Sequence, residues 1–79
     1  MAQSADLSAA YKQYQSAEKQ GKYDEAITFA ETFLVLAKAE FGEEHQIYAV
    51  GLNNLALLYQ DQGRYSDAEP LFKRSLAIR

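Results

Sequence analysis

The sequence predicts an all-α protein made of two antiparallel helix hairpins, and two observations support that prediction. Gly-Lys-Tyr-Asp-Glu-Ala at residues 21–26 returns as Gly-Arg-Tyr-Ser-Asp-Ala at residues 63–68, 42 positions later. Apolar residues also recur at three- and four-residue steps in four segments with short connections between them, which favours four antiparallel helices. A repeat at fixed spacing is typical of repeat proteins, which offer a binding surface rather than an enclosed catalytic pocket.

The first hairpin is expected to lie before Gly42. The first helix contains no proline, and its apolar positions keep the helical period. Gly21 is a stop signal after this helix, and Asp24 is placed to cap the second one. The expected packing positions are Leu7, Ala10, Tyr11, Tyr14 and Ala17 in the first helix, and Ala26, Phe29, Ala30, Phe33, Leu34, Ala37 and Phe41 in the second.

The third helix is expected to begin after Gly42, which ends the second helix, and after a polar joint at residues 43–46. Gly51 costs a helix about 1 kcal/mol relative to alanine, so we expect that a neighbouring helix approaches closely at this point. The expected packing face of the third helix is Tyr48, Leu52, Leu55, Ala56 and Tyr59.

The fourth helix is expected to follow Gly63. Ser66 and Glu69 fit a capping box, in which each side chain satisfies a backbone N–H at the start of the helix. Pro70 is then expected in the first turn, where proline is tolerated. The helix is expected to run through Leu71, Phe72, Leu76 and Ile78.

The second hairpin resembles a known family. LNNLALLY at residues 52–59 and GRYSDAEPLFKRSLAI at residues 63–78 are similar to a tetratricopeptide repeat of the kinesin-light-chain type, as are the 42-residue spacing and the joint FGEEH at residues 41–45. The resemblance implies a right-handed α-α superhelix. It also implies one domain over residues 1–79, with repeats at about 5–41 and 45–79, taken from a longer array.

The first repeat departs from the family's pattern. Tyr14 stands where Ala56 stands in the second repeat, and Ala17 stands where Tyr59 stands. The large and small residues have therefore exchanged places, which a packed core tolerates better than a net change of volume. Irregularity of this kind is expected of a terminal, capping repeat.

Composition narrows the classes of function. A net charge of −3, with eight Lys and Arg scattered among eleven acids, disfavours a nucleic-acid partner. No cysteine and one histidine leave no disulfide and no thiolate or histidine metal cluster. No apolar stretch is long enough for a membrane span, and residues 1–10 do not form a signal peptide. We therefore expect a soluble chain without cofactors, cytoplasmic by default, although a leader removed from a longer parent would leave no trace.

Catalysis is disfavoured as well. His45 beside Glu44 has no nucleophile or second acid attached to it, and Glu40, Glu43 and Glu44 lack the alternating ligands of a calcium loop. No phosphate-binding glycine loop or nucleophile elbow is present. We expect a protein that binds without turnover, not an enzyme.

The resemblance implies that the first helix of each repeat faces a concave groove, which receives an extended peptide or a partner's helix. Paired amides such as Asn53 and Asn54 suit a peptide backbone, because each offers donors and an acceptor. Taken singly, each of these polar residues is better explained as merely solvated, and the set is more persuasive than its members. Leu57 is also compatible with burial against the first helix. The candidate groove residues are Ser8, Tyr11, Lys12, Gln15 and Lys19 from the first helix, and Val50, Asn53, Asn54, Leu57 and Asp61 from the third.

The resemblance also bears on the kind of peptide. Some members of the family hold a peptide's terminal carboxylate with Lys and Asn at set positions, and only Asn54 matches that arrangement. Tyr11 and Gln15 occupy the corresponding places in the first repeat, which disfavours recognition of chaperone tails. Lys12 and Lys19 are able to attract an acidic peptide instead, each pair contributing about 0–1 kcal/mol.

Two alternatives remain open. The last helix carries Leu71, Phe72, Leu76 and Ile78 with no fifth helix to cover them, so we expect the chain to form homo-oligomers, including by exchange of helices. In the other alternative, the chain is an accessory helical segment of a larger enzyme or signalling protein.

Overall fold

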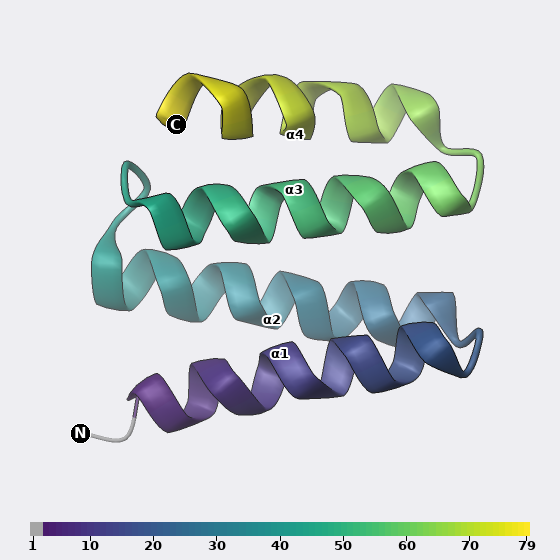
Figure 1. Ribbon diagram of the computed structural model, residues 1–79, viewed down its shortest axis with the longest axis horizontal. Coiled ribbons are helices and arrows are strands. Elements are labelled where there is room, and N and C mark those ends of the chain that lie inside the picture. Colours follow the sequence, from purple (N-terminus) through teal and green to yellow (C-terminus); the bar gives the residue numbers. More distant parts are fainter. Residues whose placement is uncertain (1–2) are drawn as a thin grey trace.

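The structure is a computed structural model that describes residues 3–79, with side chains described from Asp6 onward. It contains four α-helices: α1 (Gln3–Lys19), α2 (Tyr23–Phe41), α3 (Gln46–Asp61) and α4 (Tyr65–Ile78). The helices lie side by side in chain order, each antiparallel to the next, in a slab of 37 × 29 × 13 Å (Figure 1). The prediction of an all-α fold of two helix hairpins is confirmed. No helix in this part of the chain has the length and apolar character that a membrane crossing requires.

The turn between α1 and α2 explains why the repeated sequence starts with glycine. Gly21 adopts a positive φ of 75°, a conformation that is costly for residues with a Cβ. Its N–H donates to the carbonyl of Glu18 at 3.0 Å, and the N–H of Lys22 donates to the carbonyl of Ala17 at 2.9 Å. These two bonds form a Schellman motif, which satisfies the last carbonyls of α1 and reverses the chain.

The turn between α3 and α4 repeats this geometry. Gly63 has φ of 76°, its N–H donates to the carbonyl of Gln60 at 2.9 Å, and the N–H of Arg64 donates to the carbonyl of Tyr59 at 2.8 Å. The sequence echo at a spacing of 42 residues therefore corresponds to two hairpin turns with the same hydrogen bonds.

Replacing Gly63 with alanine is expected to lower the free energy of unfolding by about 1–2 kcal/mol, which is the cost of a left-handed backbone for a residue with a Cβ. Nothing lies within 4 Å of a Cβ placed there, so the cost comes from the backbone alone. Urea denaturation followed by circular dichroism measures it. Gly63→Asn is the matched variant and should lose less, because asparagine adopts this conformation more readily. Equal losses for alanine and asparagine would contradict the explanation.

The predicted caps of α2 and α4 are wrong. The N-cap residues are Lys22 and Arg64, neither of which makes a side-chain cap hydrogen bond, so each helix begins before the predicted cap residue. The reason is the Schellman turn, whose own hydrogen bonds already set the start of the next helix. Asp24 lies in the first turn of α2 and accepts a hydrogen bond from Gln62 at 3.4 Å, which links the two hairpins. Ser66 likewise lies inside α4.

The early start of α4 also moves Pro70. Counted from Tyr65, Pro70 lies in the second turn rather than the first, so the prediction is wrong by one turn. Proline has no N–H to donate to the carbonyl of Ser66, and α4 lacks that one bond. Arg64 Nε and Asp67 Oδ2 form an ion pair at 2.9 Å across the first turn of the helix.

Helix α3 is capped by a residue that the sequence placed in the joint. His45 is the N-cap, and its Nδ1 accepts a hydrogen bond from the N–H of Ile47 at 3.0 Å. The imidazole ring stacks on Phe41, with centroids 4.5 Å apart. His45 therefore supports the helix start, and helix α2 ends immediately before Gly42, as predicted.

The main core lies between the two hairpins, and we call it the central cluster. Its buried members are Tyr14, Ala17, Ala26, Ile27, Ala30, Leu55 and Leu58. Leu58 is completely buried, with 0% of its surface exposed, although the predicted packing face omitted it. Ile27 was omitted as well. The central cluster therefore includes residues from outside the single stripe predicted for each helix.

A second cluster packs at the end of the slab near the start of α1. It contains Leu7, Ala10, Phe33 and Ala37. Helices α2 and α3 come together beside it at Gly51, where an added Cβ would lie 2.8 Å from Leu34 Cδ2 and 2.9 Å from Phe33 Cδ1. The predicted close approach at Gly51 is confirmed.

The exchange of large and small residues in the first repeat is accommodated in the core. Tyr14, Ala17 and Ala56 are all buried. The Tyr14 ring meets the edge of the Tyr11 ring, with centroids 5.3 Å apart. Burial, together with the nearby Tyr11 and Glu18, raises the pKa of the Tyr14 phenol to about 12.

Candidate functional site

The candidate groove residues of α1 and α3 are related by the 42-residue repeat, so each α1 position has an α3 counterpart. Val50 and Leu57 are 43% and 41% exposed, which is high for branched apolar side chains on a helix beside a core. Ser8, Lys12, Lys19 and Asp61 are exposed, whereas Tyr11, Gln15, Asn53 and Asn54 are half-buried. Leu57 is thus not fully buried against α1.

Three of these residues come together around a hollow between the first helices of the two hairpins. The hollow has a volume of about 320 Å³ and is lined by Leu7, Ser8, Tyr11, Phe33, Ile47 and Val50. We call it the groove hollow. Five of its six lining side chains are apolar or aromatic. The other candidate groove residues do not line it: Lys12, Gln15, Lys19, Asn53, Asn54, Leu57 and Asp61.

The floor of the groove hollow is held by aromatic packing. The Tyr11 ring lies 5.8 Å from the Phe33 ring at an interplanar angle of 49°. Because Phe33 is buried in the core and Tyr11 also contacts Tyr14, the floor belongs to the packed interior. The rim includes Val50, which remains partly exposed. The hollow therefore has a fixed base and an apolar edge accessible to a partner.

The polar groups along the groove have unused binding capacity. Within the described residues, the amides of Asn53 and Asn54 make no hydrogen bond, and Lys12 and Lys19 take part in no ion pair. Amide donors and acceptors of this kind suit a peptide backbone. Lys12 and Lys19 add positive charge on the α1 side.

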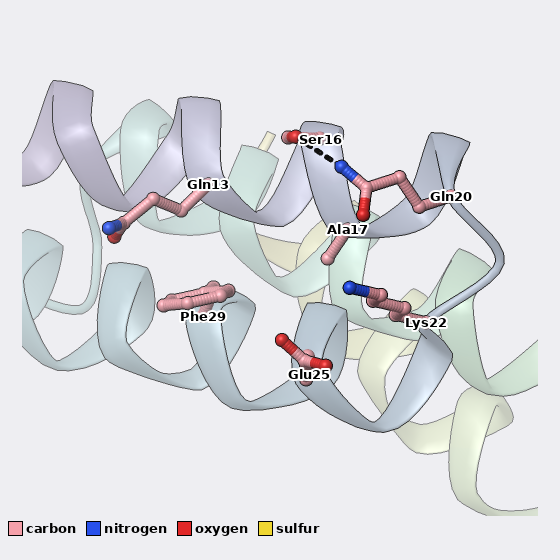
Figure 2. Close-up of a pocket in the computed structure, with 7 residues that line it drawn as sticks. All are labelled: Gln13, Ser16, Ala17, Gln20, Lys22, Glu25 and Phe29. Atoms are coloured by element: carbon pink, nitrogen blue, oxygen red, sulfur yellow. Dashed lines mark hydrogen bonds between the residues drawn. The ribbon is translucent and has the colours of Figure 1, made fainter.

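A second hollow lies on the outer side of the first hairpin, between α1 and α2. It has a volume of about 160 Å³ and is lined by Gln13, Ser16, Ala17, Gln20, Lys22, Glu25 and Phe29. Figure 2 shows Gln13 and Phe29 from the two helices beside the hollow, and Gln20 donating to the Ser16 hydroxyl at 3.2 Å. We call this side the first-hairpin outer face.

The repeat shows what distinguishes this outer face. Gln13 and Ser16 correspond, 42 residues later, to Leu55 and Leu58, which are buried in the central cluster against α2. Gln13 and Ser16 are both exposed. The first-hairpin outer face is therefore polar at the two positions where the second hairpin uses leucine to bind its neighbour.

A third hollow lies between α3 and α4 at the opposite end of the slab. It has a volume of about 260 Å³ and is lined by Gln60, Tyr65, Ala68, Glu69, Phe72 and Lys73. Leu76, one turn beyond Phe72, is 75% exposed. Leu71 was expected to be exposed, but it is half-buried and packs against the central cluster. Ile78 is half-buried too.

The acidic joint between α2 and α3 is engaged in ion pairs. Glu43 lies 3.3 Å from Lys38 Nζ and 3.2 Å from Arg74 Nη2. The Lys38 ammonium, with a smaller contribution from Arg74, holds the pKa of Glu43 below its ordinary value. These pairs connect α2, the joint and α4. The described residues contain no group of three or more His, Cys, Asp or Glu side chains able to hold a metal ion.

Leu7, Phe33 and Ile47 line the groove hollow but were not predicted as groove residues. Leu7 and Phe33 were assigned to the core, where they also belong, and Ile47 was left outside the predicted stripe of the third helix. Its position three residues before Val50 was the available signal, because side chains at this spacing share a helix face.

Comparison with known proteins agrees with the two hairpins and their shared core. A family model described as tetratricopeptide repeat matches residues 8–79, which is most of the chain. No curated protein matches the chain. The matched range includes both hairpins and the two glycine turns within them. The chain belongs to the tetratricopeptide repeat family.

Proposed function

We propose that this chain is a non-catalytic interaction scaffold, which binds an extended peptide or a partner's helix along α1 and α3. Tetratricopeptide repeats are generally protein-interaction scaffolds. The observation that best supports the proposal is the groove hollow. An apolar hollow of about 320 Å³ is at the lower end of the range for ligand pockets, so it suits a bulky side chain of a partner.

The polar residues of the groove add a preference for the partner's backbone and charge. Asn53 and Asn54 supply amide hydrogen bonds, each worth about 0.5–1.5 kcal/mol. Lys12 and Lys19 favour a partner with acidic residues near its apolar anchor, at about 0–1 kcal/mol for each exposed pair. The proposed ligand is an acidic segment with one bulky apolar residue.

The 42-residue spacing and the FGEEH joint support assignment to the kinesin-light-chain type of repeat.

Panning a phage-displayed library of random peptides against the chain tests the proposal. The enriched peptides are expected to share a bulky apolar residue with acidic neighbours. Val50→Asp and Leu57→Asp should weaken binding at least tenfold, because burial of such a side chain is worth about 1.5–3 kcal/mol. Asn54→Ala should weaken it about two- to tenfold. Fluorescence anisotropy with an enriched peptide measures these changes.

The matched control is Val35→Asp on α2, since Val35 is an exposed valine that does not line the groove hollow. It should bind the peptide as the unchanged chain does. Enriched peptides without an apolar residue, or equal binding by the groove variants and the control, would rule out the groove as the binding surface.

A second proposed function concerns a different surface, on α4. The exposure of Leu76 and the hollow beside Phe72 support homo-association of the chain through this helix. The two functions are separable, because groove variants should leave the oligomer size unchanged.

A further inference from the structure

We propose that two copies of this chain pair through α4, antiparallel about a two-fold axis. The paired surface consists of Tyr65, Glu69, Phe72, Lys73 and Leu76, and we call it the α4 outer face. The inference rests on the proposed homo-association and adds its geometry and its partner, a second copy of the same face.

The repeat relates the α4 outer face to the surface of α2 that packs against the second hairpin. Ala26, Ile27 and Ala30 of α2 are buried in the central cluster with Leu55 and Leu58 of α3. Their equivalents, 42 residues later, are Ala68, Glu69 and Phe72, of which the last two remain at least partly exposed. Helix α4 thus repeats the surface by which α2 contacts the second hairpin, and Phe72 stands where α2 has Ala30.

The first-hairpin outer face does not fit this surface. In a head-to-tail stack, the first-hairpin outer face of one copy would pack on the α4 outer face of the next. Gln13 and Ser16 would then take the places that Leu55 and Leu58 have in the internal contact, which is the contact between the two hairpins of one chain. Glu69 would moreover replace Ile27 opposite them. A polar face against a face with an exposed carboxylate buries little apolar area, so this contact cannot reproduce the internal one.

The α4 outer face instead complements itself. With a two-fold axis level with Leu71 and a rise of about 1.5 Å per residue, Glu69 and the Lys73 of the second copy lie at the same height, about 3 Å from the axis. Along the helix, Tyr65 lies about 9 Å from the axis on one side and Leu76 lies about 7.5 Å from it on the other. Tyr65 of one copy therefore meets Leu76 of the second copy. The two Phe72 rings lie beside the axis. Every group on this face therefore has a suitable partner in the second copy.

The side chains are accessible for such pairing. Glu69 and Lys73 form an ion pair at 3.8 Å within the helix, with side-chain exposures of 73% and 76%. An exposed pair of this type contributes little to stability, so exchange for the equivalent pair across the axis costs little. Two-fold contacts of one patch with itself are also the commonest form of homo-oligomer.

Sedimentation equilibrium of the 79-residue chain tests the proposal first. The unchanged chain is expected to reach a dimer and stop there, because the paired face is used up. Leu76→Lys is expected to weaken dimerisation at least tenfold, since it removes an apolar contact at both ends of the interface. The matched control is Val35→Lys, which places lysine at another highly exposed apolar position and should leave the dimer intact.

Charge exchange tests the antiparallel arrangement specifically. Glu69→Lys and Lys73→Glu should each weaken dimerisation, because each sets like charges opposite one another. A mixture of the two single variants should recover association as a heterodimer, and the variant with both changes should pair with itself. A merely local effect on α4 would not produce recovery on mixing.

The outcomes separate the proposals. A chain that stays monomeric at high micromolar concentration overturns both homo-association and its geometry. Association that Leu76→Lys and the charge variants leave unchanged overturns the α4 pairing alone. Growth beyond a dimer with rising concentration would show the head-to-tail stack instead.

Discussion

Leu58→Ala is expected to lower the free energy of unfolding by about 2–5 kcal/mol, the range found when a buried leucine is cut back to alanine. Leu58 is completely buried in the central cluster, where the two hairpins meet. A chain of this size has a total stability of only about 4–12 kcal/mol at typical values per residue. The substitution is therefore expected to remove a large share of the stability that holds the hairpins together.

The neighbouring residue provides the control. Leu57→Ala makes the same chemical change one position earlier on α3, at a side chain that is 41% exposed, and should cost less than about half as much. Urea denaturation of both variants, with the midpoint and slope read separately, measures the difference. Equal losses at the two leucines would contradict the placement of the core. If the Leu58→Ala chain loses the helicity of one hairpin and keeps that of the other, the two hairpins unfold separately.

The omission of Leu58 from the predicted core has a physical reason. The helical period predicts one apolar stripe for each helix, which is correct for a helix with neighbours on one side only. Helix α3 lies between α2 and α4, so its buried arc is wider and includes Leu58 as well as the predicted Leu52, Leu55 and Ala56. Ile27 on α2 was omitted for the same reason. The width of a buried arc depends on tertiary neighbours, and the helical period alone does not contain it.

The helix ends were predictable only in part. The positive φ of Gly21 and Gly63 follows from the role of glycine after a helix, and the repeat of the motif predicted both turns. The predicted caps at Asp24 and Ser66 failed because a polar residue near a helix start is a local signal. The hydrogen bonds of the Schellman turn had already set the starting residue, and that geometry is not visible in the spacing of polar residues.

The candidate groove shows the same limit. The 42-residue period predicted which residues of α1 and α3 share a side of the repeat. It did not predict that Phe33, from α2, would supply part of the floor of the groove hollow. A contact that joins three helices depends on how closely the helices approach, and that approach is set at Gly51.

Gly51→Val is expected to destabilise the fold by about 1–3 kcal/mol through overpacking. A Cβ at this position would lie 2.8 Å from Leu34 Cδ2 and 2.9 Å from Phe33 Cδ1, and valine adds two further methyl groups. The end of Leu34 is flexible and can turn aside. The Phe33 ring is buried and packs against Tyr11, so it can move only by disturbing the cluster around it.

Two matched variants separate overpacking from helix propensity. Gly51→Ala should lose less than valine, because alanine is favoured over glycine in a helix by about 1 kcal/mol and offsets part of the clash. Ala39→Val introduces a branched residue at an exposed position of α2 and should cost well under 1 kcal/mol. A gain in stability for Gly51→Val would contradict the close approach of α2 and α3.

The same variant tests whether packing controls binding. Phe33 is both the residue that a Cβ at Gly51 would push and part of the floor of the groove hollow. Gly51→Val is therefore expected to weaken binding of a groove peptide at temperatures where the variant remains folded, although residue 51 does not line the groove hollow. Peptide affinity measured by anisotropy, together with helicity measured by circular dichroism, checks this. Unchanged affinity in a folded but destabilised variant would show that the floor of the groove hollow does not depend on the spacing of α2 and α3.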